Sequence, residues 1–248
     1  MQKRSSTARS SKSGLWLYGM HTVQAALENP NRQKSRLIAT DSAFEELSHR
    51  LTKPLPFRHE IMDRLALDKI CGRDAVHQGV ALSVSPLPDA DSEAMLQRPG
   101  PILILDQVTD PRNIGAILRS AMAFGAAGVI MQDRHSPEES GVLAKAASGA
   151  LDHVLVMRAV NLNREIDRFK EKGFWVVGLD AHGELFDGNQ FSKRRLVLVL
   201  GAEGSGIRPL IRKNCDEFAR LNMRGPIDSL NVSVAAAVAL YEVARTSS

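Results

Sequence analysis

The stretch that decides the fold spans residues 228–242 and reads DSLNVSVAAAVALYE. Almost every position after Asn231 is apolar, and a helix without a polar stripe is normally buried on all sides, in a core or a subunit interface. The polar residues crowd the first turn, where Asp228 or Ser229 can cap exposed backbone donors. The side-chain amide of Asn231 needs a hydrogen-bond partner, which is either a group in the protein or a ligand bound at the start of this helix.

A strand that ends in a glycine-rich turn lies upstream of this helix. Residues 196–200 are all aliphatic and lead directly into Gly201-Ala202-Glu203-Gly204-Ser205-Gly206. The turn lacks the Gly-Lys-Ser/Thr of a P-loop, and its glycine spacing differs from the dinucleotide fingerprint of nicotinamide-dependent enzymes. It would let the backbone approach a ligand closely, with Glu203 pointing into the crevice.

Residues 101–223 alternate strands with helices, which indicates an α/β domain with a mainly parallel sheet. The expected strands are residues 102–105, 128–131, 153–157, 174–179, 196–200 and 218–223. Ligands bind such sheets at the carboxyl ends of the strands. Three polar segments that contain glycine lie at such ends, namely residues 106–119, 201–206 and 223–231. We therefore expect a binding site where these three segments meet.

A smaller α/β unit, residues 14–85, precedes this domain. Residues 86–99 contain prolines, acids and small polar residues, which is typical of a linker. Residues 1–13 carry four basic residues, no acid and no apolar periodicity, which predicts a disordered basic tail. The expected organisation is a tail, a small domain, a linker and a larger domain at residues 100–248.

The composition is that of an ordinary soluble globular protein, with 44% hydrophobic and 24% charged residues. No apolar run approaches the roughly 18 residues that a membrane helix needs, and no secretory signal is visible. Cys71 and Cys215 match no disulfide or zinc pattern, so we expect a cytoplasmic protein without a metal. The net charge of the chain is +4, which equals the charge of the four basic residues in the tail. A basic tail on a near-neutral body suits a polyanionic partner such as RNA. A solubilising tail would also explain it.

The helix expected after residues 102–105 carries Arg112 and Arg119, which are seven residues apart and share one stripe. Two guanidinium groups over small residues could clamp a phosphate, although a solvated basic face would show the same spacing. Arg32 belongs to a second basic cluster, with Lys34 and Arg36. A solvated loop explains that cluster as well as an RNA contact does.

Three segments resemble the three motifs of the SpoU (TrmH-type) RNA 2′-O-ribose methyltransferases, in the same order and spacing. They are Asn113–Ala121, Leu200–Gly206 and Met223–Ala235. Residues 145–150 resemble another stretch of this family. Residues 18–23, 29–32 and 77–80 resemble its appended RNA substrate-binding domain. The two-domain layout is most similar to the subgroup that methylates a guanosine of 23S rRNA.

The resemblance implies a deep trefoil-knotted α/β (SPOUT) fold and a homodimer with the active site at the subunit interface. It also implies S-adenosylmethionine as the cofactor and an RNA ribose 2′-oxygen as the methyl acceptor. The residues that match catalytic and substrate-positioning positions of the family are Asn113, Arg119, Glu203, Ser229 and Asn231. The expected cofactor-binding residues are Gly201, Leu221, Met223, Ser229 and Leu230. The expected RNA contacts are Arg32, Arg112 and Arg119.

One position departs from the family pattern, which has Ile-Pro-Met where this chain has Leu221-Asn222-Met223. Loss of the proline frees φ and restores a backbone donor, so we expect a less rigid loop in which backbone contacts to the cofactor survive. The arginine that matches Arg119 is the family's proposed base. Because a guanidinium keeps its proton in proteins, the alternative is that Arg119 stays charged and stabilises the developing alkoxide.

Two related functions remain open. A non-catalytic RNA-binding protein could share the fold, but the complete set of catalytic positions argues against it. The same reaction on tRNA is the other alternative. Only the presence of the N-terminal domain favours rRNA, by analogy with the two-domain subgroup that methylates 23S rRNA. Methylation of a base nitrogen fits less well, because the motifs match the ribose class.

Overall fold

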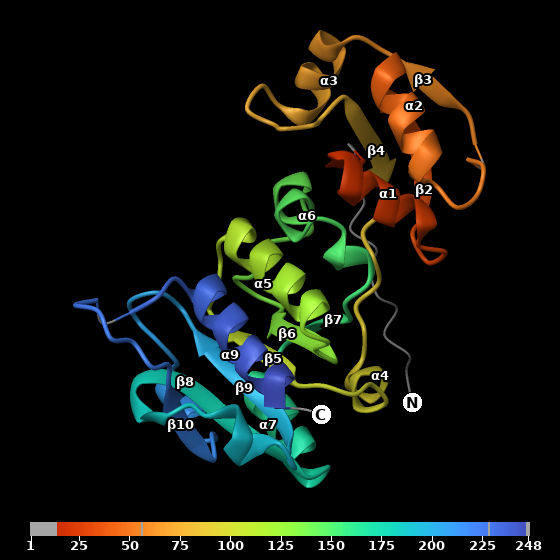
Figure 1. The fold of residues 1–248 in the computed structure, drawn as a ribbon. Helices are drawn as coiled ribbons and strands as arrows, with labels where there is room; N and C mark the ends of the chain where they lie inside the picture. Colours follow the sequence, from red (N-terminus) through yellow and green to blue (C-terminus); the bar gives the residue numbers. More distant parts are fainter. Residues whose placement is uncertain (1–13, 56, 228, 247–248) are drawn as a thin grey trace.

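The computed structural model describes residues 14–55, 57–227 and 229–246. Two features expected from the sequence, the basic tail at residues 1–13 and the possible helix cap Asp228, lie outside the described residues. The described chain forms two α/β units, each with its own sheet (Figure 1). None of the described helices combines the length and the apolar character that crossing a membrane requires.

The N-terminal unit is built on a four-stranded sheet in the order β1-β4-β2-β3. Its strands are β1 (Leu15–Tyr18), β2 (Lys34–Ala39), β3 (His59–Ile61) and β4 (Val80–Val84). Its helices are α1 (Met20–Glu28), α2 (Asp41–Arg50) and α3 (Arg64–Cys71). The sequence does not predict β3, because all of its residues are exposed and it therefore lacks the apolar alternation of a half-buried strand.

The C-terminal unit is built on a six-stranded sheet in the order β10-β8-β9-β5-β6-β7, with every pair parallel. Its strands are β5 (Ile102–Asp106), β6 (Gly128–Gln132), β7 (Val156–Ala159), β8 (Phe174–Leu185), β9 (Arg195–Gly201) and β10 (Glu217–Arg220). Its helices are α5 (Pro111–Ala123), α6 (Gly141–Ala147), α7 (Leu162–Glu171), α8 (Pro209–Arg212) and α9 (Val232–Thr246), with 3-10 turns η1 (Ala150–Asp152) and η2 (Gly188–Phe191). The predicted α/β fold class is confirmed. Strand order does not distinguish a knotted chain from an unknotted one, so the trefoil knot stays a prediction.

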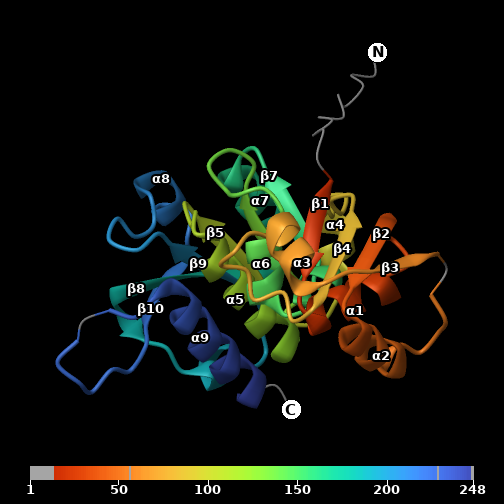
Figure 2. The same ribbon diagram turned by 90° about the horizontal axis from the view of Figure 1, so that it is seen from above.

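Helices cover both faces of the parallel sheet. On β5, Leu103 and Leu105 pack in the cluster that includes residues of α5, α6 and α9. Ile102 and Ile104 pack on the opposite face with residues of α7 and α8. All four side chains are fully buried, which explains why this strand is apolar at successive positions. Figures 1 and 2 both show α5 and α9 side by side over one face.

The interval between the two sheets, residues 85–101, includes the segment predicted as a linker and holds the short helix α4 (Ser92–Leu96). Its backbone is tied to the C-terminal unit. Leu87 N donates a hydrogen bond to Glu139 Oε2 at 3.0 Å, and Ala90 N donates to the Val156 carbonyl at 2.8 Å. This segment therefore lies along the C-terminal unit.

Helix α9 differs from its prediction in two ways. It begins at Val232, so the polar residues before it belong to a loop. Its buried residues are Val232, Ala236, Ala239 and Leu240, whereas Val234, Val238 and Tyr241 are 46%, 39% and 53% exposed. Within one chain the helix is thus buried on one face only, and an apolar stripe stays accessible on the other.

Candidate active site

The three segments predicted to form a site do meet at the carboxyl edge of the parallel sheet. The ends of β5 and β9 are neighbours; Asn113 lies in the first turn of α5, Glu203 lies in the loop after β9, and Asn231 immediately precedes α9. The start of α5 is fixed by Pro111 and by Asp110, whose carboxylate accepts a backbone N–H of the first turn at 2.7 Å. The register of α5 therefore places Asn113 beside the other two loops.

Glu203 is the acceptor at the centre of this arrangement. Its Oε1 accepts hydrogen bonds from Nδ2 of Asn231 at 2.6 Å and from Nδ2 of Asn113 at 3.2 Å. It also accepts the backbone N–H of Val232 at 3.4 Å. The Nδ2 of Asn231 donates in addition to Asn113 Oδ1 at 3.0 Å. We call Asn113, Glu203 and Asn231 the amide–carboxylate cluster.

The amide of Asn231 is satisfied by the protein itself. Its Oδ1 accepts hydrogen bonds from the backbone N and the Oγ of Ser233, at 2.9 and 2.6 Å, which caps the start of α9. With its oxygen and its nitrogen both bonded, the amide has one orientation. Glu203 and Asn231 nevertheless remain exposed, so the cluster is pre-oriented and accessible. Because Glu203 Oε1 accepts three donors, its role in this geometry is to orient the two amides.

An ion pair between a buried aspartate and a partly exposed arginine supports the loop that carries Glu203. Asp106, at the end of β5, is fully buried and accepts hydrogen bonds from the backbone N and the Nε of Arg208, at 2.8 and 2.7 Å. Gly206 N donates to the Ala202 carbonyl at 3.0 Å, so the loop is also closed across its own base. Sequence reasoning missed Asp106 and Arg208 as supporting residues. The available signal was an acid directly after a fully apolar strand.

The glycine-rich loop is tight at its base and open at its tip. An added Cβ at Gly201 would lie 2.2 Å from the carbonyl carbon of Gly206 and 2.4 Å from Ile207 N, so no other residue fits there. Gly204 and Gly206 have φ of +83° and +66°, which L-residues rarely adopt, and an added Cβ at either meets nothing within 4 Å. The backbone at the exposed tip, around Gly204, is therefore accessible to a ligand.

The other predicted cofactor residues lie in the loop between β10 and α9. Leu221, Met223 and Leu230 are half-buried and Ser229 is exposed. Leu221 packs against the main core cluster, whereas Asn222, the departure from the family pattern, is exposed. The half-buried apolar side chains could hold an aromatic ring system beside the open backbone of the glycine-rich loop.

Arg112 and Arg119 are both exposed on α5. Neither guanidinium forms an ion pair or hydrogen bond with another residue in the part of the chain that the structure describes. Both cations are therefore available to a phosphate. No hydrogen bond joins Arg119 to the amide–carboxylate cluster of its own chain.

Arg32 does not occupy the position expected for an RNA contact. Its side chain has no exposed surface, and its Nε lies 2.9 Å from Asp152 Oδ1. Its Nη1 is paired with Glu139. Both acids belong to the C-terminal unit, so Arg32 joins the two units and does not face solvent. The sequence could not show this, because the partners lie more than 100 positions away.

Neither cysteine has the character of a catalytic nucleophile. Cys71 and Cys215 are free, and burial raises the pKa of the Cys71 thiol to about 11 and that of the Cys215 thiol to about 12. Both thiols therefore stay protonated near neutral pH. Across residues 14–55, 57–227 and 229–246, no three His, Cys, Asp or Glu side chains are grouped to hold a metal ion.

The geometry at Glu203 predicts different results for two substitutions. For the RNA methylation that the resemblance implies, Glu203→Gln should keep kcat within about 10-fold of wild type, because one amide oxygen can still accept the hydrogen bonds that Oε1 accepts. Glu203→Ala should lower kcat by about 100-fold, because both asparagine amides lose the group that orients them. Initial rates at saturating substrates measure this, with circular dichroism as the folding control. Equal losses in both variants would show that the negative charge matters and not the acceptor.

Two family matches together cover most of the chain. Residues 100–241 match the SpoU rRNA Methylase family. Residues 16–90 match a domain described as RNA 2'-O ribose methyltransferase substrate binding. The parallel α/β sheet, with its site built from three loops at one edge, is thus that of a SPOUT-class protein. The chain belongs to the SpoU rRNA Methylase family.

Curated relatives carry related names. The chain is 37% identical over 239 residues to an uncharacterized tRNA/rRNA methyltransferase of Synechocystis sp., an alignment that covers 92% of this chain and 62% of the relative. It is 40% identical over 178 residues to a putative TrmH family tRNA/rRNA methyltransferase of Staphylococcus aureus, which covers 69% of this chain and 72% of the relative. The chain thus spans less than two thirds of the Synechocystis relative.

Solved structures share the fold. The SpoU methyltransferase AviRb from Streptomyces viridochromogenes, in complex with the cofactor AdoMet, aligns with a TM-score of 0.76 at 23% identity, over 94% of this chain and 90% of that one. The AdoMet-bound rRNA methyltransferase from Sinorhizobium meliloti aligns with a TM-score of 0.75 at 22% identity, over 94% and 87%. At this level of identity the likeness shows the fold.

Proposed function

We propose that this protein is an S-adenosylmethionine-dependent RNA methyltransferase of the cytoplasm, which methylates a ribose 2′-OH of a guanosine in 23S rRNA. The observation that carries the proposal is the amide–carboxylate cluster. Asn113, Glu203 and Asn231 come from three separate motifs and are joined by hydrogen bonds at one edge of the sheet. The match of residues 16–90 to a substrate-binding domain and the names of the relatives support RNA as the substrate.

The residues around the glycine-rich loop fit S-adenosylmethionine. The tip of the loop has open backbone at Gly204, which would hydrogen-bond a polar ligand. Leu221 and Leu230 are half-buried apolar side chains in the loop between β10 and α9, and they would hold the adenine. When bound, the cofactor would supply an electrophilic methyl group.

The chain's own residues then position the acceptor. Asn231 and Ser229 would hold the ribose and the methionine end, because displacement at a methyl group needs the reacting atoms about 3–3.5 Å apart and in line. Arg119 would bind a neighbouring phosphate and stabilise the negative charge that develops on the 2′-oxygen. The proton would leave to that phosphate or to water, since a guanidinium is a poor base.

A homodimer would complete this site. The exposed apolar stripe of α9 consists of Val234, Val238 and Tyr241, and Met122 on the adjacent α5 is 50% exposed. The ring of Tyr241 lies 5.9 Å from that of Phe124, so the stripe continues from one helix to the other. A second copy packed here would bury these side chains and could bring its Arg119 to the cluster. This explains why the helix is apolar on both faces.

The test uses purified protein and S-adenosylmethionine with a labelled methyl group. Protein-free large-subunit rRNA and bulk tRNA, both from a strain that lacks the modification, are offered separately and then digested to nucleosides. The expected result is label in 2′-O-methylguanosine from rRNA. Label only in tRNA would keep the chemistry and overturn the substrate. No label in either RNA, together with no binding of the cofactor, would overturn the enzymatic proposal and favour a non-catalytic RNA-binding protein.

A further inference from the structure

One buried guanidinium lies in the contact between the two units, in addition to the packing of β1 and α1 against α6 and η1. Arg32 lies between α1 and β2 and its side chain has no exposed surface. Its Nε and Nη2 donate to the two carboxylate oxygens of Asp152 at 2.9 and 3.2 Å, which is the bidentate geometry that gives such pairs directional specificity. Its Nη1 donates to the Ser85 carbonyl at 3.1 Å and to Glu139. We call this group, Arg32 with Asp152 and Glu139, the inter-unit ion pair.

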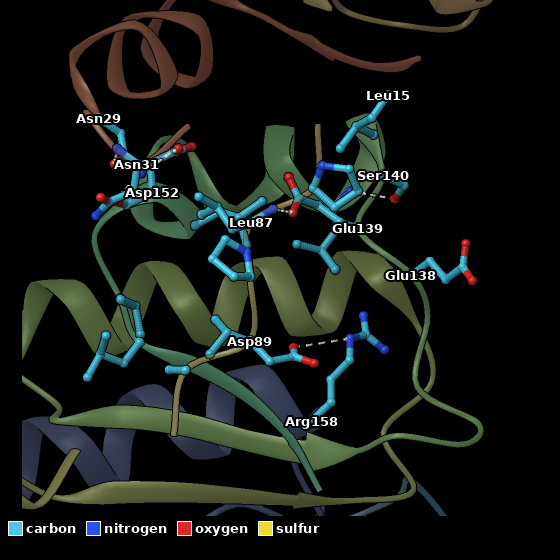
Figure 3. A pocket seen from close by; sticks show the side chains of 18 of the residues that line it. Leu15, Asn29, Asn31, Leu87, Asp89, Glu138, Glu139, Ser140, Asp152 and Arg158 are labelled. Carbon is cyan, nitrogen blue, oxygen red and sulfur yellow. Dashed lines mark hydrogen bonds and ion pairs between the residues drawn. The ribbon is translucent and has the colours of Figure 1, made fainter. Parts of the chain in front are cut away.

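Neighbouring hydrogen bonds tie the same acids to the N-terminal unit and to the linker. Asn29 Nδ2, at the end of α1, donates to the Asp152 carbonyl at 3.2 Å and to its Oδ1 at 3.0 Å. Leu87 N donates to the second oxygen of Glu139 at 3.0 Å. Figure 3 shows Asp152 beside Asn29 and Glu139 beside Leu87. Three parts of the chain therefore converge on these two carboxylates.

Beside this group lies a cavity of about 1450 Å³, lined by residues of both units. The acids on its wall are Asp89, Asp91, Asp133, Glu138, Glu139 and Asp152. Its two arginines, Arg98 and Arg158, each donate to a backbone carbonyl of the C-terminal unit. The two units also pack directly on each other, because β1 and α1 contact α6 and η1 and one apolar cluster includes residues of both units. Apolar packing is non-directional, whereas the bidentate contact of Arg32 has a fixed geometry, so the inter-unit ion pair is the contact that specifies the orientation of the units.

We propose that Arg32 is a positioning residue, which sets the orientation of the N-terminal unit so that RNA held there presents its target ribose to the amide–carboxylate cluster. This rests on the proposed function. A buried ion pair that loses one partner leaves an uncompensated buried charge, which strongly disfavours the original packing. Water would then enter to solvate the two carboxylates, which belong to the C-terminal unit, and the N-terminal unit would shift relative to them. A displacement of about 1 Å far from the chemistry can lower a rate by about 100-fold.

The test compares Arg32→Met with a control at another arginine ion pair. Arg36 binds Glu60 through two hydrogen bonds of 2.7 Å, but both side chains are exposed and both belong to the N-terminal unit. Small-angle X-ray scattering reports the separation of the units, and limited proteolysis reports exposure of the segment at residues 86–91. Calorimetry measures cofactor affinity. Steady-state kinetics measures kcat/KM for RNA.

Arg32→Met should increase the radius of gyration and speed cleavage of the segment by about 10-fold, whereas Arg36→Met should change neither. The kcat/KM for RNA should fall by about 100-fold, with the cofactor dissociation constant within about 2-fold of wild type. Arg32→Lys keeps the charge but cannot bind both acids in the same fork geometry, so it should recover part of the loss. Arg32→Met/Asp152→Asn should be no worse than Arg32→Met alone, because the two residues act together.

Two results would overturn the proposal. One is a folded Arg32→Met variant with unchanged scattering and cleavage. The other is an equal loss of cofactor affinity and RNA activity, which would indicate a global structural role. If Arg32→Met does not fold, Arg32→Lys and Asp152→Asn take its place. Unchanged scattering in both of these variants would also overturn the proposal. If wild-type protein methylates no RNA, the proposed function fails, while scattering and cleavage still decide the role of Arg32.

Discussion

Replacing Arg119 by alanine should lower kcat for RNA methylation by about 100- to 1000-fold, while the dissociation constant of the cofactor stays within about 2-fold of wild type. The reason is that the guanidinium is exposed and unpaired within the described chain, so its charge is free to stabilise an oxyanion that exists only near the transition state. Arg112→Ala is the matched control on the same stripe of α5. Arg112→Ala should raise KM for RNA with a smaller effect on kcat, because a phosphate contact stabilises the bound ground state and the transition state equally.

The same substitution tests which protomer supplies Arg119. Arg119→Ala and Asn231→Ala proteins, each inactive alone, are mixed and allowed to exchange subunits, with light scattering to establish the dimer. If Arg119 acts across the interface, mixed dimers contain one intact site, and activity should recover to at most about a quarter of wild type after random exchange. No recovery in mixed dimers would show that Arg119 acts within its own chain. A monomeric wild type would overturn the homodimer.

The pH dependence of the rate separates the two roles of Arg119. If its guanidinium were the base, the rate would rise with pH up to the alkaline limit, because deprotonation would limit the reaction throughout. If it stays charged, the rate should reach a plateau well below that limit. A continuous rise would contradict electrostatic stabilisation as its main contribution.

The parts of the site that the sequence predicts are those in which one short segment decides the local structure. Asn113 follows an Asp-Pro cap, Asn231 precedes an apolar helix, and Glu203 sits among glycines. Each local signal places a polar group at a strand or helix end, and the rule for parallel sheets brings these ends together. The hydrogen bonds among the three residues then confirm the expectation that the segments meet.

What the sequence could not show depends on contacts between distant residues. Arg32 looked like a surface cation because its neighbours Lys34 and Arg36 are basic, yet its partners lie in the other unit. Strand β8 continues past residue 179 because it pairs with β10 in two separate registers. Neither the distant partners of Arg32 nor the extension of β8 produces an apolar periodicity or a turn signal in the local sequence. The sequence predicts that α9 is apolar all round, but only the structure shows that one chain leaves one of its faces uncovered.

Gly201→Ala should abolish cofactor binding within the measurable range, a loss of at least about 100-fold in affinity, while the chain stays folded. The added Cβ would overlap the backbone of Gly206 and Ile207, with contacts of 2.2 to 2.4 Å. The loop has little freedom to relieve this overlap, because Gly201 pairs with Asp106 in the sheet and Arg208, just beyond the loop, is held by the same aspartate. The methyl group must therefore force the loop open.

An opened loop would lose the arrangement of backbone at its tip and would move Glu203 away from the two asparagines. Overpacking of this kind typically costs about 1–3 kcal/mol, so the melting temperature should fall by several degrees without loss of the folded state. Gly225→Ala is the steric control, since an added Cβ there meets nothing within 4 Å and its melting temperature should not change. Calorimetry with S-adenosylmethionine measures the affinity. Wild-type affinity in folded Gly201→Ala would show that the cofactor binds elsewhere, because a loop displaced by a backbone overlap cannot keep the contacts that we assign to it.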